Sequence, residues 1–386
     1  MPRVSVVMPS YNLDRFIGKS IQSILDQTYQ DFEIIITDDG SSDGTVSVIK
    51  QFTDPRIQLE VFPQNKGATI AINNCIQNAC GLYVAVLNSD DIWEPSKLEK
   101  QVAFLDEHPG ISAVFTKVEF IDEEGNLGAA EKAKRPDVFN MENRSRYAWL
   151  NHFFFRGNCL CHPSVLIRKK CYDEIGLYNS RMSVLPDFDM WVRLCMKYDI
   201  HIMDEKLVRF RIFTGETNAS GDILPTHIRI HFEILPILDH YLSIRNKEEF
   251  LGIFPEASRY GEVENRYIPY FLGRLAQNMD DSSWRLWSLK VLYDFMADES
   301  VEKELAEKYG FRYRDFLKLT AEYDIFHLGL LVPPPPPPPL VAHLIEIDPQ
   351  KHGALVNFAV KMHNTMASVM IKLYVWVGGL LARMAK

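Results

Sequence analysis

Short apolar runs alternate with amphipathic stretches along the first part of the chain. Strands are predicted at 4–8, 32–37, 57–61 and 83–87, because each run is short and rich in apolar or β-branched residues. Between them, apolar residues recur at helical spacing, which predicts helices near 17–25, 44–51 and 68–79. Strands that alternate with helices predict an α/β fold with a mostly parallel central sheet covered on both faces.

Polar clusters follow three of these strands. The first strand is followed by Pro9-Ser10-Tyr11-Asn12, the second by Asp38-Asp39-Gly40 and the fourth by Asn88-Ser89-Asp90-Asp91. Ligands of open α/β sheets bind at the carboxyl ends of the strands, so these side chains are expected at a ligand site. Carboxylates suit a hard divalent cation, Mn²⁺ or Mg²⁺, and such a cation suits a diphosphate.

Five motifs in order resemble those of family-2 glycosyltransferases. They lie at 4–12, 34–45, 65–67, 87–91 and 187–191, and the resemblance covers roughly residues 1–220. It implies a GT-A fold and inverting transfer of a sugar from a nucleotide-diphosphate donor, for which a UDP-sugar is favoured.

The resemblance also implies a donor site. Asp38 or Asp39 would accept a hydrogen bond from a uracil-like ring, in a pocket shaped by Pro9 and Tyr11. Asn65 and Gly67 would form a loop in which glycine lets the backbone approach the nucleotide. The residues expected to bind the nucleotide-sugar are Pro9, Tyr11, Asp38, Asp39, Asn65, Gly67, Asn88 and Asp91. Asp43, which precedes Gly44-Thr45, is expected to cap a helix instead.

Asp90 is the predicted metal ligand, and the metal would stabilise the departing nucleotide diphosphate. Asn88 stands where the family's Asp-x-Asp motif has its first Asp, so it is expected to bond a ribose hydroxyl without adding charge. Asp91 is expected either to assist or to cap the turn into a helix that begins near Pro95.

The predicted catalytic base is Asp187, at the start of a predicted helix. Inverting transfer is a single displacement in which one carboxylate takes the proton of the acceptor hydroxyl. Asp189 is the alternative, because Pro186 stands where the family usually has Glu. Arg211, near the end of a later strand, is expected to meet a phosphate or to lie at the surface.

Composition restricts the class of protein. The chain has 386 residues, 47% of them hydrophobic, which is enough for a large core with extensions. Its six cysteines lack metal-ligand spacing and suit a reducing cytoplasm, and no signal peptide is predicted before the first strand. The formal net charge of −9 argues against a nucleic-acid partner.

Four regions are predicted. Residues 1–220 form the GT-A domain, and 221–332 form a helical extension that either binds the acceptor or makes a homo-oligomer. Residues 333–339 are seven prolines, a polyproline II spacer of about 22 Å. Residues 340–386 form a tail with a basic stripe on an apolar helix.

The tail predicts peripheral binding to an anionic membrane, on the inner face of the cell membrane. Its basic residues, with no acid among 351–386, are Lys351, Lys361, Lys372, Arg383 and Lys386. Packing of this helix on its own domain or on a second subunit is the alternative.

Together these features predict a metal-dependent inverting glycosyltransferase that acts on a glycan or lipid-linked acceptor in cell-surface polysaccharide biosynthesis. The alternative is a non-catalytic nucleotide-sugar-binding or scaffold protein, since four positions depart from the family pattern: Ile72, Asn88, Pro186 and Phe213. A processive synthase is disfavoured without a Gln-x-x-Arg-Trp motif. An oxidoreductase is disfavoured because no Gly-x-Gly-x-x-Gly follows the first strand.

Overall fold

The computed structural model describes residues 1–129, 137–213, 223–322 and 324–325. The α/β prediction is confirmed, and each predicted strand and helix of the first hundred residues is present to within a few residues. The alternating part comprises β1 (Val4–Ser10), α1 (Ile17–Leu25), β2 (Phe32–Asp38), α2 (Thr45–Ile49), β3 (Ile57–Val61), α3 (Ala68–Asn78), β4 (Tyr83–Val86), β5 (Ile92–Trp93) and α4 (Lys97–Glu107).

Further strands and helices complete this half of the molecule. They are β6 (Ile111–Ile121), α5 (Arg146–Arg156), the 3₁₀ helix η2 (His162–Ser164), β7 (Leu166–Arg168), α6 (Lys170–Ile175), α7 (Pro186–Lys197) and β8 (Asp199–Arg211). The strands form a single sheet in the order β3-β2-β1-β4-β7-β6-β8-β5. Only β5 and β7 run against the others, so the sheet is mostly parallel.

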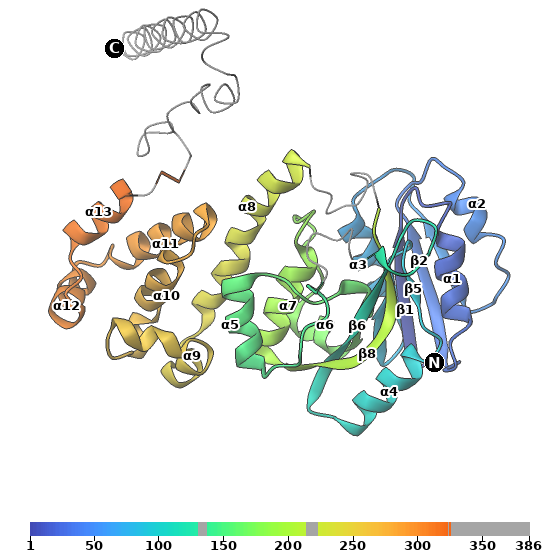
Figure 1. Cartoon of the computed structure of the whole chain (residues 1–386), viewed down its shortest axis with the longest axis horizontal. Coiled ribbons are helices and arrows are strands. Elements are labelled where there is room, and N and C mark those ends of the chain that lie inside the picture. The colour runs from blue at the N-terminus through green and yellow to red at the C-terminus, as the bar shows by residue number, and fades with distance from the viewer. Residues whose placement is uncertain (130–136, 214–222, 323, 326–386) are drawn as a thin grey trace, which may run out of the picture. The chain divides into compact units, whose positions relative to one another are not determined.

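Helices cover both faces of the sheet, as the burial pattern along β1 requires. Val4, Val6 and Met8 point into one core, which α1, α2 and α4 complete, while Val7 points into the other. On α1, Ile17, Ile21 and Ile24 form the buried stripe. The second face is covered by α3, α5, α6 and α7 (Figure 1).

The core on this second face continues into the C-terminal helices. These are α8 (Leu224–Asp239), η3 (His240–Ser243), α9 (Lys247–Ile253), η4 (Pro255–Tyr260), η5 (Asn265–Tyr267), α10 (Ile268–Gln277), α11 (Ser282–Phe295), α12 (Glu299–Tyr309) and α13 (Tyr313–Glu322). Phe154 on α5 packs edge-on against Tyr241, Phe254 and Trp287 of this region. Trp284 donates its indole N–H to the carbonyl oxygen of Phe154 at 2.9 Å.

Burying side chains of this size stabilises the fold by about 1.5–3 kcal/mol each relative to exposure. The helices therefore belong to the same core as α5 and α7, and Figure 1 shows those two between the sheet and α9 to α11. Residues 1–320 form one compact unit.

The predicted boundary at 220/221 falls within 214–222, outside the described residues, and remains a prediction. The polyproline spacer at 333–339 and the tail at 340–386 also lie outside them. Among the helices that the structure describes, none is long and apolar enough to cross a membrane.

Candidate active site

The carboxyl ends of the parallel strands bring the predicted acids to one edge of the sheet. β1 pairs with both β2 and β4 in parallel register, so the residues after Ser10, Asp38 and Val86 share that edge. β8 runs in the same direction, so its last residue, Arg211, also ends there.

Asp38 lies fully buried and joins the ends of β1 and β2. It accepts hydrogen bonds from the Ser10 hydroxyl (2.8 Å), the Ser41 backbone N–H (2.8 Å) and the Ser41 hydroxyl (2.6 Å). Asp38 therefore fixes the turn that follows β2.

Asp39 connects that turn to the predicted nucleotide loop. Its two carboxylate oxygens accept the backbone N–H groups of Lys66 (2.7 Å) and Gly67 (2.8 Å). Gly67 has φ +104°, a conformation that glycine adopts readily. A Cβ on Gly40 would lie 2.7 Å from the backbone of Gln64, so glycine is required for this close approach. The structure thus brings Asp39, exposed Asn65 and Gly67 together, and their binding of a nucleotide remains a prediction.

The residues after β1 dock on the same turn. Pro9, within β1, lies opposite Thr37 in the β1–β2 pair, and Tyr11 remains 45% exposed. Asn12 adopts left-handed backbone (φ 51°), which asparagine tolerates better than most residues. Its side-chain oxygen accepts the Ser42 backbone N–H at 2.9 Å. Asn12 stands in the polar cluster after the first strand but was not among the residues predicted to bind the donor, although its place in that cluster was a usable signal.

Asp91 lies within the protein instead of facing an open pocket. It accepts the Asn88 amide (3.1 Å) and the Arg211 backbone N–H (2.8 Å). Burial, together with the neighbouring charge of Asp90, raises the pKa of Asp91 well above its usual range.

Arg211 is 2% exposed, so the expectation of a surface position is wrong. Its guanidinium donates to the carbonyl oxygens of Asp90 (2.8 Å), Asp122 (2.7 Å) and Glu123 (2.8 Å). Arg211 therefore links the 88–91 turn to the residues that follow β6.

Asp90 is the carboxylate of this turn that stays partly exposed. In the described part of the chain, no side chain donates a hydrogen bond to it, and burial raises its pKa to about 6. A bound cation would offset that unfavourable burial of charge, so the residue fits a metal ligand. Within the described ranges, no group of three or more His, Cys, Asp or Glu side chains gathers for a metal. A single carboxylate of this kind fits Mg²⁺, which usually takes one or two carboxylates from a protein.

Asp187 lies in the first turn of α7 and is also partly exposed. It accepts the Asn158 amide at Oδ2 (2.8 Å) and the Phe188 backbone N–H at Oδ1 (2.8 Å). Burial raises the pKa of Asp187 to about 6 despite these two hydrogen bonds. At neutral pH the carboxylate is mostly ionised yet more basic than an ordinary aspartate, which suits a general base.

Asp189 has different surroundings. Its Oδ2 accepts the Arg193 guanidinium at 2.8 Å, and its Oδ1 lies 2.8 Å from Nε2 of His240. Burial alone would raise the pKa of Asp189, but the bond with His240 and the charge of Arg193 lower it overall. The side chain is 3% exposed, so both oxygens are committed within the protein.

Cys161 is buried near both parts of the candidate site. Burial, with the nearby charges of Asp91 and Asp187, raises the pKa of the Cys161 thiol well above its usual range. Asp91 and Asp187 therefore both lie within electrostatic range of Cys161. The partners Ser10, Asn158 and Arg211 were not predicted in these roles, because each acts through a contact distant in sequence. Ser41 was not predicted either, although it bonds Asp38 only three residues earlier.

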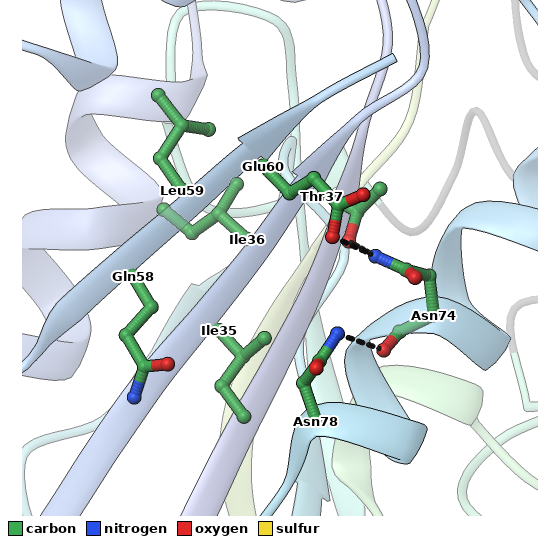
Figure 2. A pocket seen from close by; sticks show the side chains of 8 residues that line it. All are labelled: Ile35, Ile36, Thr37, Gln58, Leu59, Glu60, Asn74 and Asn78. Carbon is green, nitrogen blue, oxygen red and sulfur yellow. Dashed lines mark hydrogen bonds between the residues drawn. The ribbon is translucent and has the colours of Figure 1, made fainter.

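A hollow of about 210 Å³ opens beside the candidate donor site, along the edge strand β3. Figure 2 shows its side chains, among which Asn74 donates to Glu60 (2.7 Å) and to Thr37 (3.0 Å). The hollow is smaller than typical ligand pockets, and none of the predicted site residues lines it. It is therefore distinct from the candidate donor site.

Known proteins resemble this chain in sequence. Residues 5–168 match the model described as glycosyl transferase family 2. A Bacillus subtilis protein provisionally named teichuronic acid biosynthesis glycosyltransferase TuaG is 40% identical over 222 residues, which are 57% of this chain and 82% of TuaG. This chain belongs to glycosyltransferase family 2. The predicted family is confirmed.

A second relative of this glycosyltransferase has a more specific name. The Escherichia coli protein WfgD, a UDP-Glc:α-D-GlcNAc-diphosphoundecaprenol β-1,3-glucosyltransferase, is 40% identical over 125 residues, covering 32% of this chain and 49% of WfgD. Among solved structures, S. aureus TarS 1–349 in complex with UDP-GlcNAc superposes with a TM-score of 0.54 at 16% identity. That match covers 81% of this chain and 93% of TarS 1–349. The predicted GT-A fold is confirmed.

Proposed function

We propose that this family-2 glycosyltransferase transfers a sugar, with inversion, from a UDP-sugar to a hydroxyl of a glycan or lipid-linked acceptor in cell-surface polysaccharide biosynthesis. The surroundings of Asp187 carry the proposal: a partly exposed carboxylate with a pKa of about 6 at the start of a helix. The names of TuaG and WfgD support the pathway class, and that of WfgD supports a UDP-sugar donor and a lipid-linked acceptor.

In the proposed reaction, Asp187 accepts the proton of the acceptor hydroxyl as its oxygen forms a bond to C1 of the sugar. The bond from C1 to the donor's phosphate oxygen breaks on the opposite face, and UDP leaves. Asp187 is favoured over Asp189 because the latter already pairs with Arg193 and His240.

The donor would lie over the turns after β1, β2 and β4. Tyr11 and Asn65 are the exposed members of the predicted set and would contact the nucleotide, while Asp39 orients the loop carrying Asn65 and Gly67. Asp90 would be the protein ligand for Mn²⁺ or Mg²⁺. A bound cation supplies charge neutralisation for the diphosphate as it departs.

The tail at 340–386 is proposed to bring the enzyme to an anionic membrane, where a lipid-linked acceptor would be found. Its basic residues and its apolar content support this. The test is co-sedimentation of the full chain, and of a chain ending at residue 339, with vesicles of anionic lipid and with vesicles of neutral lipid. Equal binding of both chains to anionic vesicles would contradict the proposal.

The first test is calorimetric titration with UDP, GDP and dTDP, each with and without Mn²⁺ or Mg²⁺. Metal-dependent binding of UDP is expected. Transfer is then assayed with UDP-glucose and a synthetic GlcNAc-diphospholipid, and the anomeric configuration of the product is read by NMR. UDP binding without transfer from any UDP-sugar to any tested acceptor would favour a nucleotide-sugar-binding protein that lacks catalysis.

A further inference from the structure

Glu233 on α8 is a buried carboxylate that bonds three consecutive backbone amides. Its Oε1 accepts the N–H of Ser183 at 2.7 Å, and its Oε2 accepts those of Val184 (2.9 Å) and Leu185 (2.8 Å). Glu233 is only 3% exposed. Water therefore cannot replace these hydrogen bonds unless α8 separates from residues 183–185.

The three amides belong to the segment that leads into the catalytic helix α7. Leu185 caps α7, Pro186 is its first residue and brings no N–H, and Asp187 follows. Amides ahead of a helix need acceptors, and a negative charge is favoured near a helix N-terminus. Charged acceptors also form stronger hydrogen bonds than neutral ones. Glu233, which belongs to the C-terminal helices, thus bonds the backbone amides directly before α7.

The opposite side of this segment is bonded to α3, the helix that follows the Gly67 loop. The hydroxyl of Thr69 donates to the carbonyl oxygen of Met182 at 3.0 Å. The amide of Asn73 both donates to the Tyr178 carbonyl (2.8 Å) and accepts the Tyr178 N–H (3.0 Å). Residues 178–185 therefore lie between α3 on the donor side and α8.

A second contact joins the C-terminal helices to the same helix. His240, seven residues after Glu233, bonds Asp189 of α7 at 2.8 Å. Glu233 and His240 thus form hydrogen bonds with residues on either side of Asp187: Glu233 with 183–185, and His240 with Asp189. Neither lies within residues 5–168, the part of the chain that matches the family model.

We propose that Glu233 is a positioning residue for sugar transfer, which fixes the start of α7 and so the place of the Asp187 carboxylate. This inference rests on the proposed role of Asp187 as base. A displacement of about 1 Å at a reacting group can lower the rate about 100-fold, whereas binding of the nucleotide alone does not depend on where the base lies. Loss of the Glu233 contacts should therefore lower kcat and leave UDP affinity unchanged.

The test compares Glu233→Gln with Glu249→Gln in the full chain. Glu249 lies on α9 and pairs with Arg146, which bonds carbonyl groups at the far end of α7, so it provides the same chemical change away from Asp187. Each variant is measured for kcat, for UDP affinity by calorimetry, and for backbone hydrogen exchange of peptides covering 178–190 by mass spectrometry.

We expect Glu233→Gln to lower kcat about 10- to 100-fold, with UDP affinity within about twofold and faster exchange at 183–185. Glu249→Gln should change neither kcat nor hydrogen exchange at 183–185.

Faster hydrogen exchange with normal kcat in Glu233→Gln would overturn the positioning role. Unchanged exchange would show that Glu233 does not hold the amides of 183–185. A parallel loss of kcat and UDP affinity would indicate a general structural defect and also count against the proposal. If the wild-type chain transferred no sugar, the proposed function would be contradicted instead. The hydrogen-exchange data would still decide whether Glu233 holds residues 183–185 in place.

Discussion

Asn158 donates a hydrogen bond of 2.8 Å from its side-chain amide to Oδ2 of Asp187. The backbone N–H of Leu160 bonds the oxygen of the same amide at 3.0 Å, so the donor end faces the carboxylate. Asn158 therefore orients the proposed base and stabilises its charged form.

Asp187→Asn should lower the transfer rate about 100- to 10,000-fold, the usual contribution of a general base, and leave UDP binding intact. The measurements are transfer kinetics and calorimetry with UDP. Asp173→Asn, the same change at an exposed position on α6, is the control and should keep normal activity. Normal transfer by Asp187→Asn would show that another group takes the proton.

The rate should depend on pH through Asp187. Since the base must be ionised, kcat/KM should rise through an apparent pKa of about 6 and level off above it. Asn158→Ala removes a hydrogen bond to the charged form, so the midpoint should move to higher pH by up to about one unit. Asn78→Ala, which alters an exposed amide on α3, should leave the midpoint unchanged. A midpoint unaffected by Asn158→Ala would count against Asp187 as the titrating group.

Asp187→Asn should also make the protein more stable at pH 8. The folded-state pKa of Asp187 is raised from 3.8 to about 6, so between these values the folded chain binds more protons than the unfolded chain. Its stability then falls as pH rises through that window, by at most roughly 3 kcal/mol. The neutral variant avoids this loss, so its free energy of unfolding should exceed the wild type's by about 1–3 kcal/mol at pH 8. Urea unfolding at pH 8 and pH 4 checks this, because the difference should shrink to below about 1 kcal/mol at pH 4, close to the unfolded-state pKa of 3.8.

Asp90→Ala should abolish the metal-dependent part of UDP binding. Asn88→Asp should act differently, since it replaces the donor to Asp91 by a second carboxylate. That variant is expected to lose roughly 1–3 kcal/mol of stability without metal and to be stabilised by added Mn²⁺ more than the wild type. Thermal unfolding with and without Mn²⁺ measures both effects. Equal stabilisation of Asp90→Ala and wild type by Mn²⁺ with UDP would contradict the assignment of Asp90.

Arg211→Met should destabilise the fold by at least about 1–3 kcal/mol, because it leaves the carbonyl oxygens of Asp90, Asp122 and Glu123 without their guanidinium donor. Arg209→Met is the matched control two residues earlier. Arg209 pairs with Glu94 at a position where its side chain is 40% exposed, and exposed pairs contribute about 0–1 kcal/mol. Similar unfolding midpoints for the two variants would show that Arg211 is not an essential link.

Local patterns predicted strands β1 to β4 of the eight-stranded sheet and the acids at its edge. The apolar runs before Asp38 and Asp90 indicate strands on their own, and parallel strands end at a common edge. What the sequence did not reveal are partners distant along the chain. Arg211 is charged and close to the end of a strand, and only its burial and its hydrogen bonds to Asp90 and Asp91 show that it packs against the 88–91 turn. Asn158 and Glu233 likewise lie in stretches without a motif, and their roles follow from tertiary packing.

The shared core of α5 and the C-terminal helices has a consequence for the limits of the domain. The match to the family model ends at residue 168, but the apolar side chains around Phe154 do not end there. A protein cut after residue 213 would leave that aromatic cluster open to water, and exposed apolar surface of this kind promotes aggregation. The stretch that the family model matches is thus shorter than the stretch whose side chains form this shared core.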